Sequence, residues 1–246
     1  MSTKLYQILS RQLLFLTGTD VYPFLQKLLT NDIEKLKIQD NSILYNCLLN
    51  TKGRIVADIF VYRAKNNIFM DCDYSQLDQL LTYFKRYKMR QDIEFHIIDE
   101  WKIYQSLFHT KNYSNTDVLV FPDPRAQCLG NRFFVKNIDL YKYNVMHEID
   151  FVNHRYKEGI CEGREITGTD AIPHEYNMDI LNALSFTKGC YLGQELVTRT
   201  QFRGKVRKRV CPFIFENPIN LERGDIEIPR YVFSVFNNEI IRSGKL

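Results

Sequence analysis

The feature that most constrains the fold is the way strand-forming runs turn back on themselves and alternate with single helices. Two apolar runs, 43–49 and 55–63, flank the residues Asn-Thr-Lys-Gly at 50–53, a pattern typical of a β-hairpin. Helical spacing of apolar residues over 21–29 and 75–89 predicts one helix before this hairpin and one after it. Locally paired strands that alternate with single helices favour an α+β fold over a doubly wound parallel sheet.

The same signals predict the other elements. Residues 5–16 predict a strand that runs into a turn, and Asp20 and Ser75 are placed to cap the two helices. A helix is predicted over 141–157 and a long polar connection over 159–175, and long ordered connections are often functional. A loop is predicted at 110–116, and further strands at 68–72, 93–98, 101–108, 206–215 and 231–236.

Composition is that of a globular protein. The chain has 246 residues, 45% of them hydrophobic and 25% charged, which is enough for one large or two ordinary domains. No apolar run approaches the roughly 20 residues that cross a bilayer, so we expect no membrane association. The net charge of +4 is mild, but basic residues are dense at 203–209. This basic run is either a solvated strand and turn, or an anion surface for a polyglutamate tail, an acidic partner or RNA.

The six cysteines form no Cys-x-x-Cys pair, which favours a reducing compartment over a disulfide framework. Cys47, Cys72 and Cys211 have apolar or strand-like neighbours and are predicted to be buried. Cys190 differs, because Lys188 precedes it by two residues and a helix is predicted to begin near residue 193. A positive charge and a helix N-terminus both lower the pKa of a thiol, so Cys190 is predicted to be reactive.

The segment around this cysteine, residues 188–204, reads Lys-Gly-Cys-Tyr-Leu-Gly-Gln-Glu-Leu-Val-Thr-Arg-Thr-Gln-Phe-Arg-Gly. Its glycines allow sharp turns and a close approach to a ligand. Glu195 and Arg199 are four apart, so they either form a helix-stabilising ion pair or position the lysine, the thiolate or a ligand. A thiolate suits an iron-sulfur cluster, but clusters usually take about four protein ligands. A cluster bound through Cys190 would therefore be shared with a second protein.

This segment resembles the fingerprint of the YgfZ-type folate-binding iron-sulfur cluster maturation family, which is related to the glycine-cleavage T protein. Blocks at 24–32, 48–54, 123–132 and 154–175 resemble the family in the same order, so the resemblance covers roughly residues 14–213. Ser-Phe-Thr before the fingerprint and Arg-Lys-Arg after it resemble the mitochondrial and alphaproteobacterial branch.

The resemblance implies a fold and a function. We expect residues 1–204 to form a folate-binding-type α+β region of two interleaved subdomains around a central cavity, and 205–246 a reduced, β-barrel-like C-terminal domain. The implied function is that of an accessory factor in the assembly or repair of four-iron four-sulfur clusters, more a maturation factor than a classical enzyme. Tetrahydrofolate is the implied cofactor and an A-type iron-sulfur scaffold protein the implied partner.

The resemblance also implies site residues. Cys190 and Lys188 are the implied reactive pair, with Cys190 as the shared cluster ligand. Arg11 and Phe151 stand at the positions of two tryptophans that line the folate site of bacterial relatives, so one aromatic is replaced and one is lost. Phe151 could equally be a core residue, and Arg155 and Glu158 could equally form a salt-bridged helix end. The implied cofactor-binding residues are Phe151, Arg155, Glu158, Gly189, Gly193, Gln194, Glu195 and Arg199.

Two other functions compete. A folate-dependent one-carbon (aminomethyl) transferase is disfavoured because it has no need of the Cys190 thiol. An RNA-binding or tRNA-modification factor is disfavoured because the chain has neither a strongly basic face nor an RNA-binding motif, so no direct nucleic-acid partner is expected. We expect a bacterial cytoplasmic protein, or a mitochondrial matrix protein if the chain is a processed eukaryotic one.

Overall fold

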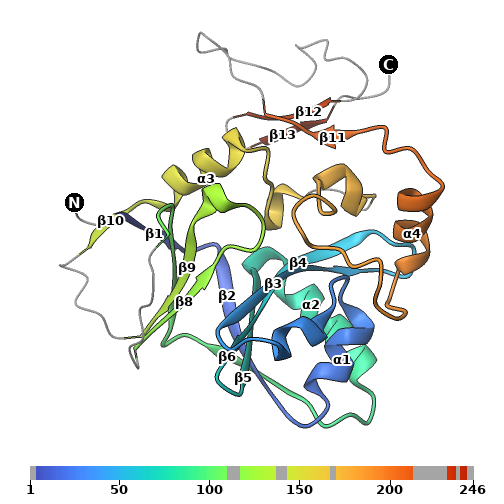
Figure 1. The fold of residues 1–246 in the computed structure, drawn as a ribbon, viewed down its shortest axis with the longest axis horizontal. Coiled ribbons are helices and arrows are strands. Elements are labelled where there is room, and N and C mark those ends of the chain that lie inside the picture. Colours follow the sequence, from blue (N-terminus) through green and yellow to red (C-terminus); the bar gives the residue numbers. More distant parts are fainter. Residues whose placement is uncertain are drawn as a thin grey trace.

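The computed structural model describes residues 4–109, 117–136, 143–166 and 170–212, and the backbone of two strands at 232–236 and 239–242. Two five-stranded sheets dominate these residues (Figure 1). The first contains, in spatial order, β3 (Ser42–Leu49), β4 (Ile55–Ala64), β5 (Asn67–Asp73), β2 (Arg11–Thr17) and β6 (Glu94–Ile98). The second contains β10 (Asn144–Met146), β1 (Lys4–Ile8), β7 (Lys102–Ser106), β9 (Asn131–Val135) and β8 (Val118–Pro122).

The two sheets are interleaved along the chain. The chain starts in the second sheet with β1, crosses to the first sheet at β2, and returns to the second sheet with β7. All pairs in both sheets are antiparallel except β1 with β10, where Lys4 lies opposite Asn144. Beyond them, β11 (Arg209–Val210) pairs with β12 (Val232–Phe236), which pairs with β13 (Glu239–Arg242). The predicted α+β class is confirmed, and the domain boundary at residue 204 stays a prediction.

The helices α1 (Val21–Leu28) and α2 (Tyr74–Lys88) bury their apolar faces against the first sheet. Their caps differ from the prediction. The side chain of Asp20 makes no capping bond and instead accepts from the backbone N–H of Asp92 at 2.9 Å. For α2, Asp73 rather than Ser75 is the cap, because its carboxylate accepts the Ser75 N–H at 2.8 Å.

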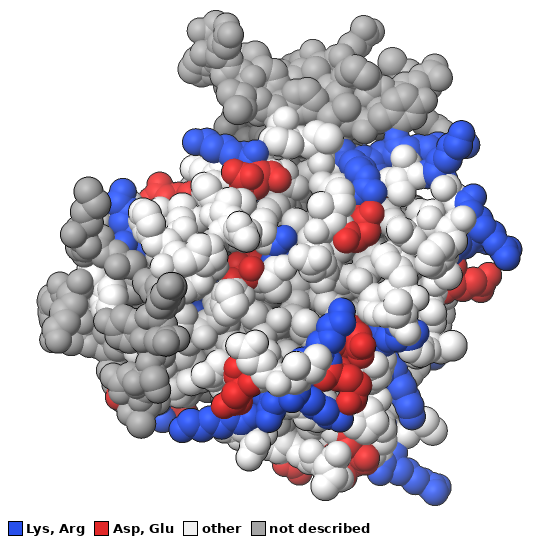
Figure 2. Space-filling model, in the orientation of Figure 1, with Lys and Arg blue, Asp and Glu red and all other residues white. Residues whose placement is uncertain are grey.

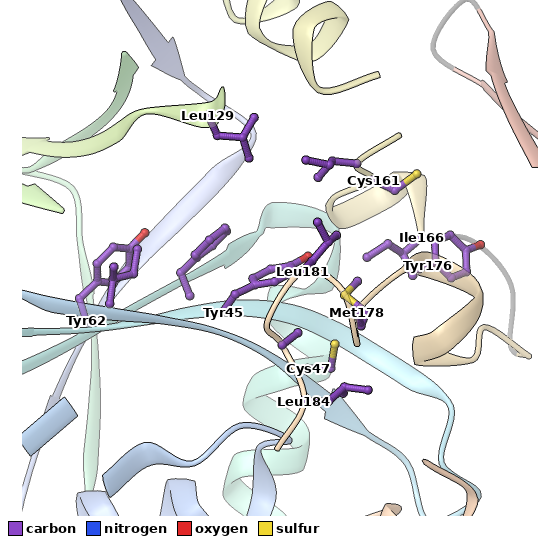
Figure 3. Packing of buried hydrophobic residues seen from close by; sticks show 14 of the residues in the cluster. Tyr45, Cys47, Tyr62, Leu129, Cys161, Ile166, Tyr176, Met178, Leu181 and Leu184 are labelled. Carbon is purple, nitrogen blue, oxygen red and sulfur yellow. The ribbon is translucent and has the colours of Figure 1, made fainter. Parts of the chain in front are cut away.

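Strand β4 is buried on both faces. Ile59 and Val61 face the α1 and α2 side, whereas Phe60 and Tyr62 alternate with them and join the larger core. This larger core lies between the two sheets and the segment that follows α3. Figure 3 shows Met178, Leu181 and Leu184 of that segment lying close to Tyr45 and Cys47 of β3. The segment that leads to Cys190 is thus part of the core.

The remaining differences from the prediction are local. Residues 5–16 form two strands, and the helix predicted over 141–157 is strand β10 followed by α3 (Glu148–Lys157), because β10 pairs with β1. The long connection contains two short 3-10 helices, η4 (Gly163–Glu165) and η5 (Pro173–Tyr176). The loop at 110–116 lies outside the described residues, as do residues 213–215 of the predicted strand 206–215, and of the described part of that strand only β11 is formed. Across the described ranges, no helix is long and apolar enough to cross a membrane.

Candidate functional site

The segment before Cys190 is fixed to the end of α1. The Ser185 N–H donates to the carbonyl of Thr30 at 3.0 Å, and the Thr30 hydroxyl donates to the carbonyl of Ala183 at 2.7 Å. Beyond the cysteine, the Leu192 N–H donates to the carbonyl of Lys27 at 3.0 Å. Bonds on both sides of Cys190 therefore hold its loop against residues 27–31.

Two glycines allow the same loop to pack closely against the β3–β4 hairpin. Gly193 has φ +76°, and a Cβ there would lie 2.5 Å from the carbonyl oxygen of Asn50. Gly53 in the hairpin turn has φ +75°, and a Cβ there would lie 2.7 Å from Cβ of Leu196. A side chain at either position would push the two segments apart. Gly189, in contrast, has open space around it and no positive φ.

Cys190 is exposed between two adjoining cavities. The smaller, of about 410 Å³, reaches towards α1 and is lined by Phe24 and Lys27. The larger, of about 730 Å³, runs along α4 (Gln194–Phe202) and is lined by Phe202 and Arg203. Both cavities share Thr51, Cys190, Tyr191 and Gly193 in their walls. The thiol thus stands where a partner or ligand could reach it from two sides.

Within the described ranges, Cys190 belongs to no group of three or more His, Cys, Asp and Glu side chains close enough to hold one ion. Glu195 lines the larger cavity together with it. Cys47, Cys72 and Cys161 are buried, and burial raises the pKa of each of these thiols. Burial of Cys47 and Cys72 agrees with the prediction, whereas Cys211 is only half-buried.

Lys188 lies in a different environment from the one predicted for it. Its Nζ donates to the carbonyl oxygens of Leu29 at 2.8 Å and Asn31 at 2.7 Å, so it anchors the loop to the end of α1. Burial lowers the pKa of this lysine to about 8, an effect that the attraction of Asp32 only partly offsets. The structure records no contact between the ammonium and the Cys190 thiol among the described residues. Lys188 and Cys190 are therefore close in sequence, but their side chains are not in contact.

The predicted helix after Cys190 is confirmed, and Gly193 is its N-cap. The side-chain carbonyl of Gln194 accepts the Tyr191 N–H at 3.2 Å, which closes the turn before the helix. Glu195 and Arg199 are both exposed and both line the larger cavity. The ion pair that was one of the two alternatives for these residues does not form in this structure. Both side chains therefore remain available to a ligand or partner.

The residues predicted to bind the cofactor fall into two groups. Gly193, Gln194, Glu195 and Arg199 line the larger cavity together with Cys190, whereas Phe151, Arg155 and Glu158 line neither of the two cavities beside it. Phe151 is 1% exposed and packs in the core near Tyr6, with ring centroids 6.1 Å apart. The guanidinium of Arg155 donates to both carboxylate oxygens of Glu165 at 2.8 Å and borders a separate cavity of about 270 Å³. Glu158 lies on the exposed end of α3. The structure therefore places the second group outside the two cavities beside Cys190, and Phe151 offers no open ring face.

A buried network of charges is the feature that sequence reasoning missed. Arg11 donates to Asp58 at 2.8 Å and also pairs with Asp71 and Glu162. Burial alone would raise the pKa of Glu162, but Arg125, Arg155, Arg11 and Arg132 together hold it well below its usual range. A signal existed, since Asp58, Asp71 and Arg132 each interrupt an apolar strand. Arg11, placed by resemblance at the position of an aromatic, is a member of this network.

The comparisons with known proteins agree with one another. An iron-sulfur cluster assembly factor IBA57 homologue, mitochondrial, from Chaetomium globosum is 30% identical over 255 residues, covering 90% of this chain and 58% of the relative. The corresponding homologue from Dictyostelium discoideum is 32% identical, covering 83% and 61%, and the human factor is 28% identical, covering 87% and 67%. The chain thus spans about three fifths of the length of the first two relatives. No family model matches the chain.

Among solved structures, the glycine cleavage system aminomethyltransferase T from Bartonella henselae matches with a TM-score of 0.62 at 12% identity. The match covers 81% of this chain and 63% of that one, and it shows the fold alone. The resemblance inferred from the fingerprint is therefore confirmed. The chain is a homologue of proteins named iron-sulfur cluster assembly factor IBA57, and it has a T-protein-like α+β fold.

Proposed function

We propose that this protein is an accessory factor in iron-sulfur cluster assembly or repair, and that Cys190 supplies one ligand of a cluster shared with an A-type scaffold protein. The names of its relatives support the first part. The observation that supports the second part is an exposed thiol on a fixed loop that belongs, within the described ranges, to no group of three or more potential ligand side chains. Since clusters usually need about four protein ligands, the remaining ligands must come from another molecule.

The residues of the loop have separate tasks in this proposal. Gly193 and the hairpin turn hold the loop in place, and Lys188 ties it to α1. Cys190 must lose its proton before it can bind iron, because the thiolate is the ligand. The two cavities beside the thiol leave room for the partner's ligand-bearing segment.

Folate binding is a separate element of the function that the resemblance implies, and the T-protein-like fold is compatible with it. At the two positions where bacterial relatives have tryptophans, the residues present do not fit a pterin, because Phe151 is enclosed and Arg11 is committed to buried carboxylates. We therefore derive no step through folate. The expectation that tetrahydrofolate binds is tested by anaerobic titration of the protein with this compound. The fluorescence of the single tryptophan, Trp101, reports binding.

The names of the relatives also bear on location. All three relatives described above are named as mitochondrial proteins, which supports the mitochondrial matrix over a bacterial cytoplasm for this chain. The one-carbon transferase remains the competing enzymatic function. The T-protein-like fold is compatible with it, but that function gives the exposed thiol no role.

The experiment that tests the proposed function is anaerobic cluster reconstitution. After incubation with iron and sulfide and removal of the excess reagents, the isolated protein should carry no cluster absorbance. In a mixture with a cluster-loaded A-type scaffold, it should elute in size-exclusion chromatography as a complex that carries the cluster absorbance. A stable cluster on the isolated chain would contradict the shared-ligand proposal. Failure of the mixture to form a coloured complex would contradict it as well.

A further inference from the structure

A group of potential metal ligands lies outside the Cys190 loop, where η2 (Gln127–Leu129) meets the C-terminal end of α3. The thiol of Cys128, the imidazole of His154 and the carboxylate of Glu158 each offer one ligand atom, and these atoms lie within 4.8 Å of one another. It is the only group of three or more such side chains that the described part of the chain brings together.

The three side chains converge for reasons of local structure. His154 and Glu158 are four residues apart at the end of α3, so they project from the same face. The His154 Nε2 lies 3.1 Å from the carbonyl oxygen of Cys128, which holds the ring next to the thiol-bearing residue. A hydrogen bond from one ring nitrogen to a backbone carbonyl is the usual way in which a metal-binding histidine is oriented.

Both ligand-bearing segments are rigidly held. Cys128 is followed by Leu129, which is fully buried, and by Gly130 with φ +65°. A Cβ at Gly130 would lie 2.1 Å from the carbonyl oxygen of Ser106, so this turn packs directly on β7. On α3, the residue next to His154 is the buried Arg155, whose guanidinium is fixed by Glu165. A site on such anchored segments loses little conformational freedom when it binds an ion.

The chemistry of the three groups selects the ion. Ca²⁺ and Mg²⁺ prefer oxygen ligands, whereas thiolate, imidazole and carboxylate together suit Zn²⁺. Cys128 and Glu158 are exposed, so an ion can enter from solvent. The Cys128 thiol donates a hydrogen bond to the Glu158 carboxylate. A bound ion would take the place of this thiol proton.

We propose that Cys128, His154 and Glu158 form a binding site for one divalent ion of the Zn²⁺ class, with a fourth coordination position open to water or to a partner's ligand. The site is separate from the one around Cys190, since Figure 1 shows α3 and α4 on different sides of the molecule. It goes beyond the proposed cluster-sharing function and does not depend on it.

Titration of the full chain with Co²⁺, a spectroscopic stand-in for Zn²⁺, tests the site. One equivalent should produce the visible bands of a four-coordinate ion and a near-ultraviolet thiolate-to-cobalt band, and Zn²⁺ should displace both. The variants Cys128→Ser and His154→Gln should each lose at least about tenfold in affinity, and Cys128→Ser should lose the thiolate band. Glu158→Gln should weaken binding in the same direction.

Two matched controls accompany these variants. Cys211→Ser removes a half-buried thiol elsewhere, and His147→Gln removes an exposed histidine at the other end of α3. Both should bind Co²⁺ as the parent does, and circular dichroism should confirm that every variant is folded. Absence of saturable one-to-one binding would overturn the proposal. So would a thiolate band that survives Cys128→Ser, or an affinity that His154→Gln leaves unchanged.

Discussion

Cys190 and Lys188 are two residues apart, yet their side chains lie in different surroundings. The thiol is exposed at the junction of two cavities, and the ammonium is bound to the carbonyl oxygens of Leu29 and Asn31. The sequence identifies both residues as special but predicts that the lysine acts on the thiol. The direction of a lysine side chain is set by tertiary contacts, in this case by the end of α1, which the local sequence does not contain.

We predict that Cys190 is the thiol that reacts fastest with iodoacetamide. Its competitor is Cys128, which is also exposed, but partial desolvation of its thiol and the Glu158 carboxylate raise the pKa of that thiol. Peptide mass spectrometry at neutral pH over a time course measures both rates in one sample. Faster alkylation of Cys128, or of any buried cysteine, would show that Cys190 is not the reactive thiol.

Lys188 gives a pH-dependent prediction. The folded state holds this lysine at a pKa of about 8, below its ordinary value of 10.5, so between these values the unfolded chain binds more protons than the folded one. The free energy of unfolding therefore gains a favourable contribution as pH rises through this window. Urea unfolding at about pH 7 and about pH 10 should show a larger rise for the parent than for Lys188→Met. The exposed-lysine control Lys52→Met should behave as the parent does, and an identical rise in Lys188→Met would refute the prediction.

At the scale of elements, the fingerprint loop and the β3–β4 hairpin act as one unit. The hairpin and the helix α4 could both be predicted, because turn residues and apolar spacing are local signals. Their docking through Gly53 and Gly193 could not, since it joins segments about 140 residues apart in sequence. For the same reason the sequence predicts one helix over 141–157, where pairing with β1 imposes strand β10.

The two glycines that flank Cys190 allow a matched comparison. Gly193→Ala should lower the free energy of unfolding by about 1–3 kcal/mol, because alanine disfavours the positive φ and its Cβ would meet Asn50. Gly189→Ala should change it by less than about 0.5 kcal/mol, because the space around that residue is open. Chemical denaturation of both variants measures the difference. Equal effects would mean that the loop is not held by its contact with the hairpin.

At the scale of the whole molecule, two interleaved sheets enclose the core and leave basic side chains on one edge. Figure 2 shows Lys and Arg gathered at the upper right, where Figure 1 places the segment between α4 and β11. The predicted basic run is only partly free, since Arg209 pairs with Asp179 at 2.7 Å and donates to the carbonyl of His174. Arg203, Lys205 and Arg207 are exposed. Because Arg203 also lines the larger cavity, this edge continues towards Cys190.

We predict that this edge attracts an acidic partner or a polyglutamylated ligand. Lys205→Glu combined with Arg207→Glu should weaken binding to an acidic A-type scaffold by about fivefold or more, because like charges then face each other. Isothermal titration at two salt concentrations measures the effect, which should shrink as salt screens the charges. The control Lys85→Glu, at an exposed lysine of α2 that lines neither cavity beside Cys190, should bind the scaffold as the parent does. If the double variant bound the scaffold and a polyglutamylated folate as the parent does, the basic run would be only a solvated surface.

The overall class and the T-protein-like fold could be predicted from the sequence, because strand, helix and turn signals and the fingerprint are all local. The buried charge network could not, because Arg11, Asp58 and Glu162 come from distant parts of the chain and meet only in the folded core. The position of Arg155 at a cavity other than the two beside Cys190 is likewise a property of the packing.

The most direct test of the central claim compares two cysteine variants in the anaerobic mixture with a cluster-loaded A-type scaffold. In size-exclusion chromatography, the parent and Cys211→Ser should each elute with the scaffold in a complex that carries iron-sulfur absorbance, whereas Cys190→Ser should elute without that absorbance. If the side chains of Glu195 and Arg199 shape the cavity, Glu195→Ala and Arg199→Ala should reduce the absorbance of the complex as strongly as Cys190→Ser does. If these side chains only stabilise α4, the two variants should reduce it less. Unchanged absorbance with Cys190→Ser would contradict the claim that this thiol is a ligand of the shared cluster.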